Sequence, residues 1–298
     1  MISSPPPLWR TPAVRHLAWL CQAPPLINTG RVLDVRTVMP SDYLETLQAL
    51  DQSPEPLLAR LADGNSHRLG LYFENLYHFL LTDVLNWTIL LRNLPIRNAQ
   101  GQTLGELDFV VRNPTTKRLE HHEVAVKFYL AFDTGYTTQW YGPNARDRLD
   151  LKADRMLAHQ SRMTERPETR AVLADHHLDE PIEQAIVMPG YLFQSDHQKP
   201  PSVPDWVHPD HQRGCWIRSG QINQQDIDTW VPLYKPDWLG AYQSRARPDR
   251  TVTDEALAEA GERGWPRLFA QMKARDDGTG FEEYHRWFVM PESWPGLP

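Results

Sequence analysis

Three strand-forming runs, separated by two turn-forming segments, constrain the fold of this chain more than any other feature. The runs lie between residues 88 and 130 and have the sequences TILLRNLPIR, LGELDFVVR and LEHHEVAVKFYL. The segments between them, NAQGQT and NPTTK, have the length and composition of hairpin turns. Apolar residues recur at helical spacing before the runs, from Leu69 to Val84, and again after them, in ARDRLDLKADRMLAHQ at 145–160. The sequence therefore predicts a helix, a three-stranded meander and a second helix.

Charged side chains occupy one face of the second and third predicted strands. Because side chains alternate along a strand, Glu106 and Asp108 point away from the apolar residues that separate them. The same alternation places Glu123 and Lys127 on the charged face of the third strand. Glu74 lies on the preceding helix, at the margin of its apolar stripe. These five residues are the candidate functional residues of the meander and of the helix before it.

The charged face has two interpretations. It is either a solvated face, as one side of many antiparallel sheets is, or a site where a cation relieves the repulsion among neighbouring carboxylates. Mg²⁺, with Mn²⁺ as the alternative ion, suits the second interpretation because it takes carboxylate oxygens and keeps waters for phosphate chemistry. A lysine on the same face then stabilises the negative charge that grows during attack on a phosphodiester.

The order of these residues resembles the PD-(D/E)XK nuclease superfamily, whose core is α-β-β-β-α-β. The chain is most similar to an uncharacterised bacterial domain-of-unknown-function family assigned to that superfamily. The blocks that carry this resemblance are LGLYFE at 69–74, GELDF at 105–109, HHEVAVKFYL at 121–130 and GPNARDRLDLKADRMLAHQ at 142–160. The resemblance is clear over residues 65–165, and we expect it to extend along the whole chain.

The resemblance implies an α/β fold with a restriction-endonuclease-like core, a mixed central sheet flanked by helices. It also implies that Asp108 and Glu123 are metal ligands, that Lys127 positions or activates the attacking water, and that Glu74 is an auxiliary acid. Glu106 flanks Asp108 on the same face and is a substitute metal ligand. The resemblance therefore predicts a metal-dependent nuclease centre on the charged face.

One position departs from the superfamily pattern. The usual signature has a carboxylate two residues before the lysine, where this chain has Ala125, and Glu123 stands four residues before Lys127. At about 3.3 Å per residue, the Cα atoms of Glu123 and Lys127 are about 13 Å apart, against about 7 Å for the usual spacing. Converging side chains, a β-bulge or a different ligand would close that gap. A centre that has lost its activity is the alternative.

A basic stripe on the second helix is an additional candidate site. Arg148, Lys152, Arg155 and His159 recur at i, i+4, i+7 and i+11, and Gln160 follows them. Stacked like charges destabilise a helix unless an anion faces them. The stripe therefore binds a nucleic-acid backbone or faces the carboxylates through Lys152. The alternative is a helix whose basic residues pair with its own aspartates.

The remaining segments complete the expected organisation. We expect residues 1–65 to be a helical, proline-rich lead-in, 66–195 the nuclease-like α/β core, and 196–298 a C-terminal α/β extension packed on that core, all in one compact domain. Strands are expected at EQAIVMPGYLF, GCWIRSG and YHRWFVM. DEALAEAGERGWPRLFAQM, at 254–272, is expected to form a helix interrupted near its central glycine and proline.

Composition narrows the class of protein. The chain has 298 residues, no run of about 18 apolar residues, and no signal-like N-terminus in MISSPPPLWR, so we expect a cytoplasmic protein without membrane association. Two cysteines are too few for a disulfide framework or a four-cysteine zinc site. A net charge of −7 means that nucleic-acid binding requires a local basic patch.

The function that these patterns predict is Mg²⁺-dependent hydrolysis of a phosphodiester in nucleic acid, in DNA rather than RNA, with water as the nucleophile. A homodimer would suit cleavage of two strands. The alternative is a catalytically inactive protein of the same fold that binds nucleic acid or a protein partner, which the alanine at position 125 and the acidic net charge both allow.

Overall fold

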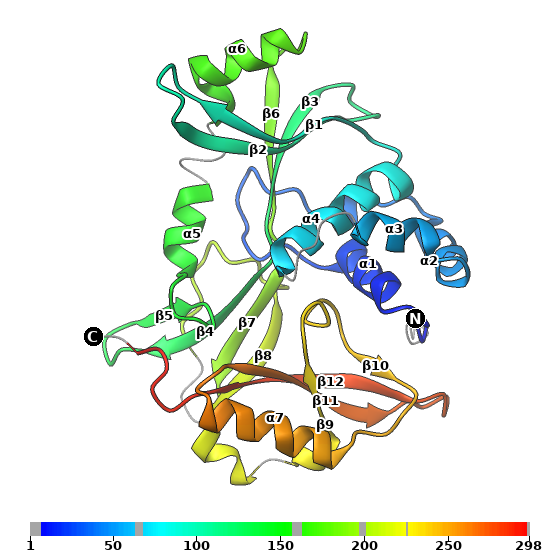
Figure 1. Cartoon of the computed structure of the whole chain (residues 1–298), viewed down its shortest axis with the longest axis vertical. Coiled ribbons are helices and arrows are strands. Elements are labelled where there is room, and N and C mark those ends of the chain that lie inside the picture. The colour runs from blue at the N-terminus through cyan, green and yellow to red at the C-terminus, as the bar shows by residue number, and fades with distance from the viewer. Residues whose placement is uncertain (1–6, 63–67, 157–162, 197–200, 225, 297–298) are drawn as a thin grey trace.

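The computed structural model describes residues 7–62, 68–156, 163–196, 201–224 and 226–296. These residues form a mixed α/β fold with two sheets, which confirms the predicted α/β class (Figure 1). The helices are α1 (Pro12–Gln22), α2 (Tyr43–Gln52), α3 (Glu55–Ala62), α4 (Leu69–Phe79), α5 (Leu149–Arg155), α6 (Pro167–Asp175) and α7 (Arg250–Glu262). Shorter helical turns are η1 (Val35–Val38), η2 (Leu80–Val84), η4 (Met163–Glu165), η5 (Ser219–Gln224) and η6 (Ile227–Thr229).

The first sheet contains the predicted meander. Its strands are β1 (Thr88–Arg97), β2 (Thr103–Arg112), β3 (Leu119–Val124) and β6 (Ile182–Val187), and their order in the sheet is β1-β2-β3-β6. The meander strands are antiparallel to one another, whereas β6 runs parallel to β3. Along the chain, α4 precedes the meander, and α5 lies between β3 and β6.

The second sheet takes its strands from both halves of the chain. They are β4 (Lys127–Asp133), β5 (Thr138–Tyr141), β7 (Gly190–Ser195), β8 (Gln212–Arg218), β9 (Trp230–Leu233), β10 (Gln243–Ser244), β11 (Arg267–Ala274) and β12 (Phe281–Met290). The order is β5-β4-β7-β8-β12-β11-β9, and β10 pairs with β12. The predicted C-terminal extension thus contributes strands to the sheet that contains β4 and β7.

The chain passes from the first sheet to the second along two neighbouring paths, β3 to β4 and β6 to β7 (Figure 1). Parallel pairing continues through this junction, because the Ala125 N–H donates to the Val187 carbonyl at 2.9 Å and the Lys127 N–H donates to the Pro189 carbonyl at 3.2 Å. The pairing offset is the same on both sides of the junction. The predicted third strand is therefore two strands in one continuous register, without an inserted residue.

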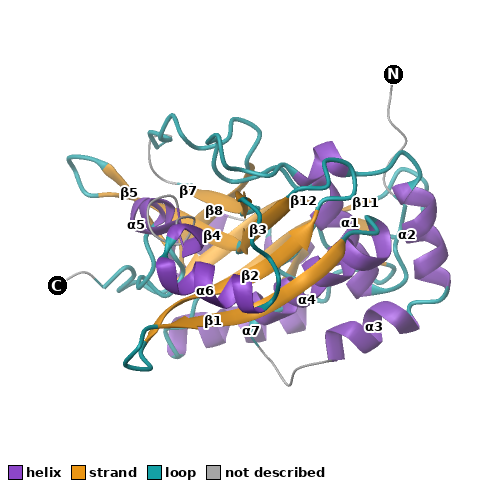
Figure 2. Cartoon of the chain, turned by 90° about the horizontal axis from the view of Figure 1, so that it is seen from above, coloured by secondary structure: helices purple, strands orange, loops and turns teal. Residues whose placement is uncertain are grey.

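Helices α1 to α4 share one apolar core with residues of both sheets, and Figure 2 shows α1, α2 and α3 grouped at one end of the molecule. Helix α1 is almost entirely buried, and its Trp19 ring stacks on Tyr191 with 6.3 Å between centroids. The apolar cluster around α1 includes Phe109 of the first sheet and Phe288 of the second. Helix α7 packs on the second sheet through a separate cluster that contains Trp230.

One sequence prediction is wrong. The segment 254–272 is not an interrupted helix, because α7 ends at Glu262 and residues from Arg267 form β11. Strand β11 lies between β12 and β9, so pairing on both sides outweighs the helical spacing of its apolar residues. Within the described residues, no helix has the length and apolar character needed to cross a membrane.

Candidate active site

Two carboxyl groups lie together where β2 and β3 leave their paired region. The pairing of Phe109 with His122 and of Val110 with His121 sets a register that brings Asp108 next to Glu123. Asp108 accepts a hydrogen bond from the Val124 N–H through Oδ2 at 2.8 Å. Glu123 is buried, with 4% of its surface exposed. The predicted alternation is therefore correct for this pair, because both side chains leave the same face of the sheet.

The environment disfavours the charged form of both carboxyl groups. Burial raises the pKa of Asp108 to about 6, although the hydrogen bond from the Val124 N–H opposes that shift. Burial and the charge of Asp108 raise the pKa of Glu123 to about 8. Within the part of the chain that the structure describes, Glu123 Oε2 is buried and has no hydrogen-bond partner. A buried carboxylate without a partner is costly, so this pair requires a proton or a cation.

Glu74 and Glu106 complete the acidic cluster, which we define as Glu74, Glu106, Asp108 and Glu123. Glu74 projects from α4 and accepts a hydrogen bond from Asn93 Nδ2 at 3.4 Å, and burial raises its pKa. Glu106 is exposed on β2, and its charge raises the pKa values of the other three members. Each of the four predicted acidic residues therefore lies within electrostatic range of at least two of the others.

Lys152 and Arg155 on α5 supply the positive charge that faces this cluster. The charge of Lys152 lowers the pKa values of Asp108 and Glu123, and the charge of Arg155 lowers that of Glu123. Burial and the charge of Lys127 lower the pKa of Lys152, so it lies within range of both the carboxyl pair and that second lysine. When all its carboxyl groups are charged, the cluster has four negative charges against the two positive charges of Lys152 and Arg155, and that excess favours binding of a further cation.

Lys127 pairs with a residue outside the acidic cluster. Its Nζ donates to Asp147 Oδ2 at 2.6 Å, and the Tyr129 hydroxyl donates to the same oxygen at 3.1 Å. The junction between β3 and β4 contains no bulge that would shorten the distance from Glu123. The charge of Lys152 acts on both members of the carboxyl pair, whereas the Lys127 ammonium is engaged by Asp147.

The predicted basic stripe divides into residues with different partners. Arg148 immediately precedes α5 and pairs with Asp150, with 2.5 Å between Nη2 and Oδ2, as the alternative interpretation of the stripe expects. Lys152 and Arg155 instead face the carboxyl groups. His159 and Gln160 lie outside the described residues. The stripe residues that the structure describes therefore have different acidic neighbours, Asp150 for Arg148 and the carboxyl groups for Lys152 and Arg155.

The carboxyl pair suits a hard divalent ion that keeps several water ligands better than an ion whose ligands all come from the protein. Across the described ranges, no three His, Cys, Asp or Glu side chains are close enough to hold a metal ion as they stand. Mg²⁺ needs only one or two carboxylates, because water completes its coordination. The unpartnered Oε2 of Glu123 beside Asp108 matches that requirement.

Comparison with known proteins identifies a family. The sequence matches the family described as Domain of unknown function (DUF1853) over residues 15–290. The chain belongs to the DUF1853 family. No curated protein and no solved structure matches it. The family match includes every strand of both sheets and all of the acidic cluster.

Sequence reasoning missed two polar residues of this DUF1853 chain. Asp147 lies in the loop before α5 and is not among the candidate residues from the sequence, but it binds Lys127 and Tyr129. His121 precedes Glu123 by two residues on β3, and burial lowers its pKa to about 3. Neither of its ring nitrogens has a hydrogen-bond partner among the described residues. The one sequence signal for His121 was its position two residues before Glu123, which places both side chains on the same face of the strand.

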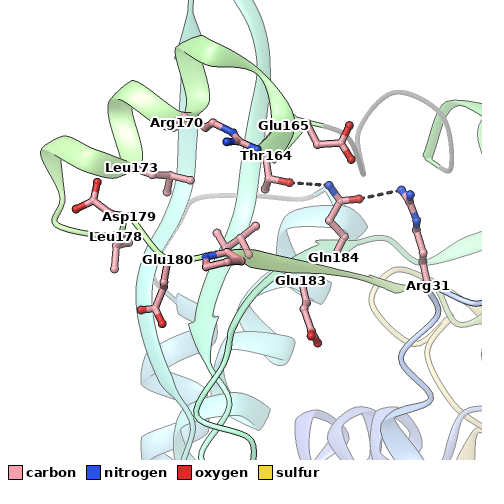
Figure 3. A pocket seen from close by; sticks show the side chains of 12 residues that line it. Arg31, Thr164, Glu165, Arg170, Leu173, Leu178, Asp179, Glu180, Glu183 and Gln184 are labelled. Atoms are coloured by element: carbon pink, nitrogen blue, oxygen red, sulfur yellow. Dashed lines mark hydrogen bonds between the residues drawn. The ribbon is translucent and has the colours of Figure 1, made fainter.

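A cavity of about 610 Å³ lies apart from the acidic cluster, between α6 and the start of β6 (Figure 3). Gln184 connects its walls by donating to Thr164 Oγ1 at 2.6 Å and accepting from Arg31 Nη1 at 2.8 Å. Its lining mixes acidic residues with Arg31 and Arg170 and includes no member of the acidic cluster. We therefore assign the candidate chemistry to the carboxyl pair and not to this cavity.

Proposed function

We propose that this chain is a Mg²⁺-dependent phosphodiesterase that hydrolyses nucleic acid, DNA in preference to RNA. The observation that carries the proposal is the buried carboxyl pair of Asp108 and Glu123, with the positive charge of Lys152 acting on both. The elements follow the order α4, β1, β2, β3, β4, β5, α5, α6 and β6 along the chain. When β4 and β5, which belong to the second sheet, and α6 are set aside, the remaining order is the α-β-β-β-α-β order of the PD-(D/E)XK nucleases, which supports the proposal. We assign the first sheet to that core as part of the proposal.

Asp108 and Glu123 would hold the metal ion, and Glu74 or Glu106 would contribute a further oxygen. Bound Mg²⁺ supplies a Lewis acid and lowers the pKa of water. In the hydrolysis, a water oxygen forms a bond to phosphorus, the bond from phosphorus to one ester oxygen breaks, and the leaving oxygen takes a proton. Lys152 faces the added negative charge, and we assign transition-state stabilisation to it because Lys127 pairs with Asp147.

The proposal includes a cytoplasmic location and a homodimer. Two identical centres related by a two-fold axis suit the two strands of a duplex. Sedimentation at increasing protein concentration, with and without a DNA duplex, tests the dimer. A mass that stays at the 34.5 kDa of one chain, with or without duplex, would remove the dimer from the proposal.

A second candidate function is a nuclease-fold protein without activity that binds nucleic acid or a protein partner. Two observations favour it: Ala125 stands where the superfamily has a carboxylate, and Lys127 is engaged by Asp147. If the protein is inactive in this way, the carboxyl pair would carry a proton at neutral pH in place of a metal ion.

Metal titration separates the two functions. Calorimetric titration of Mg²⁺ and Mn²⁺ into the wild-type protein should show binding that Asp108→Asn abolishes and that Asp175→Asn, at an exposed residue at the end of α6, preserves. Single- and double-stranded DNA and RNA incubated alongside should be cut only by the variants that bind metal. Folded wild-type protein that neither binds these ions nor cuts any substrate would overturn the proposal in favour of the inactive protein.

A further inference from the structure

A second, smaller cavity of about 240 Å³ opens beside Lys127, where β4 begins. Its walls come from the first turn of α4, the start of β4, the loop that carries Asp147, and the segment around Trp238. The residues used below are Val126, Lys127, Phe128, Asp147, Lys235 and Trp238. Lys127 is four residues beyond Glu123 on a path in continuous register, about 13 Å at 3.3 Å per residue.

One wall of the cavity is aromatic and held rigidly. The Phe128 and Trp238 rings meet edge to face with 5.2 Å between centroids, and Phe128 stacks on Tyr191 at 5.7 Å. The Trp238 Nε1–H donates to the Leu233 carbonyl at 3.1 Å, which fixes the indole orientation. A preorganised apolar wall of this kind suits a sugar or a base, because it need not be ordered when the ligand arrives.

The polar side of the cavity is cationic. Asp147 is neutralised by Lys127, whose ammonium lies 2.6 Å away, and receives a further hydrogen bond from Tyr129. Lys235 is exposed and lies over the Trp238 ring, with Nζ 4.8 Å from the centroid. The two lysines carry one more charge than the one aspartate neutralises, and this remaining positive charge lies at the edge of the aromatic wall. That combination recognises a phosphate attached to a ring system.

We propose that this cavity binds one nucleotide of a nucleic-acid strand, with its phosphate toward Lys235 and Lys127 and its sugar or base against Phe128 and Trp238. This inference rests on the proposed nuclease function and specifies how the substrate strand lies. At about 240 Å³ the cavity is smaller than the roughly 300–1,000 Å³ of sites for whole drug-sized ligands, so it suits one unit of a chain. The same strand would run from this nucleotide to the carboxyl pair.

Blocking the cavity without touching a charged group tests this assignment. Gly70 lies in the first turn of α4 on the cavity wall, and a Cβ built there meets no atom within 4 Å, so the helix has room for a ring at this wall and we expect Gly70→Phe to obstruct the opening. Gly261 on α7 is also exposed and equally open, which makes Gly261→Phe the matched control. Calorimetric binding of a single-stranded DNA hexanucleotide without added metal should weaken roughly 5- to 100-fold in Gly70→Phe and less than about twofold in the control.

Charge is tested separately from shape. Lys235→Gln should weaken hexanucleotide binding and lower the dependence of log Kd on log salt by about 0.7, the value for one phosphate contact on a single strand. Lys273→Gln is the matched control, because Lys273 is exposed on β11 and pairs with Glu282 at 3.2 Å, away from the cavity. Circular dichroism melting curves establish that all four variants are folded.

The outcomes separate the cavity from the nuclease function. If the wild-type protein cuts DNA and neither Gly70→Phe nor Lys235→Gln changes binding, the cavity assignment is overturned and the nuclease stands. If both variants weaken binding but the wild-type protein never cuts, the cavity stands and the nuclease is overturned. A wild-type protein that does not bind the hexanucleotide overturns the cavity assignment, and the metal titration alone then decides the nuclease.

Discussion

Glu123 is the residue at which the fold and the proposed chemistry impose opposite requirements. Its carboxyl group is buried on β3 beside Asp108, and both burial and that neighbour disfavour its charged form. Metal binding, however, requires the charged form. The site is therefore expected to lose a proton when it binds a cation. Both the stability of the fold and the affinity for metal should then depend on pH through this one side chain.

The first prediction concerns the stability that Glu123 contributes as the pH changes. Its pKa is about 4.5 when exposed and about 8 when folded, so the folded state keeps a proton that the unfolded state has lost. Stability should therefore be full below pH 4.5 and fall as the pH rises toward 8. Glu123→Gln removes this group, and we expect the wild type to lose roughly 2–4 kcal/mol more than the variant across that window.

Urea unfolding of both proteins at several pH values measures this difference. The comparison with Glu123→Gln matters because buried His16 and His121 titrate in the opposite sense in the wild type. Parallel stability curves for the two proteins would show that the Glu123 carboxyl group is not buried in its neutral form.

The second prediction separates the two lysines. Lys152 acts on both carboxyl groups, so Lys152→Gln should lower kcat about 10²-fold, the typical effect of removing one group that stabilises the transition state. Lys127 pairs with Asp147 and lines the smaller cavity, so Lys127→Gln should act mainly by raising KM. Steady-state cleavage of a labelled oligonucleotide measures both constants. If kcat falls further in Lys127→Gln than in Lys152→Gln, Lys127 and not Lys152 would be the lysine that stabilises the transition state.

At the scale of elements, the junction between the sheets depends on one glycine. A Cβ at Gly190 would lie 2.0 Å from the Lys127 carbonyl oxygen, because β7 and β4 approach closely there. We predict that Gly190→Ala destabilises the protein by roughly 1–3 kcal/mol through overpacking. Gly261→Ala, on an exposed helical face with no atom within 4 Å, should stabilise it by about 0.5–1 kcal/mol.

Chemical denaturation of both glycine variants gives the two free energies. The sign is the informative result, since the same substitution is expected to act in opposite directions at the two positions. A Gly190→Ala protein as stable as the wild type would mean that β4 and β7 separate readily at the junction, and that Lys127 is held less firmly than the structure indicates.

Local patterns were sufficient to predict some elements and insufficient for others. The alternation in β2 and β3 correctly placed Asp108 and Glu123 on one face, because that property depends only on neighbouring residues. The helical spacing in the segment that becomes β11 was misleading, because pairing with two distant strands decides its conformation. The Lys127–Asp147 pair depends on how a loop folds back onto β4, which sequence spacing does not encode.

At the scale of the whole molecule, α1 connects the two sheets through one core. Leu17 is fully buried and belongs to the apolar cluster that contains Phe109 of the first sheet and Phe288 of the second. Arg15 at the start of the same helix pairs with Asp237 in the C-terminal half of the chain. A segment that composition suggested was a lead-in is therefore packed in the interior, and the positions of Asp108 and of Lys127 depend on the same core.

The last prediction follows from this shared core. Leu17→Ala removes side-chain volume from a site with no exposed surface and should cost about 2–5 kcal/mol. Leu58→Ala, at a residue on α3 that is 44% exposed, should change stability by less than about 0.5 kcal/mol. Native-state hydrogen exchange should show the Leu17→Ala loss equally in β3 and β12, because the two sheets open together. A loss confined to one of these strands would mean that the sheets unfold separately, and that the carboxyl pair and the smaller cavity are stabilised independently.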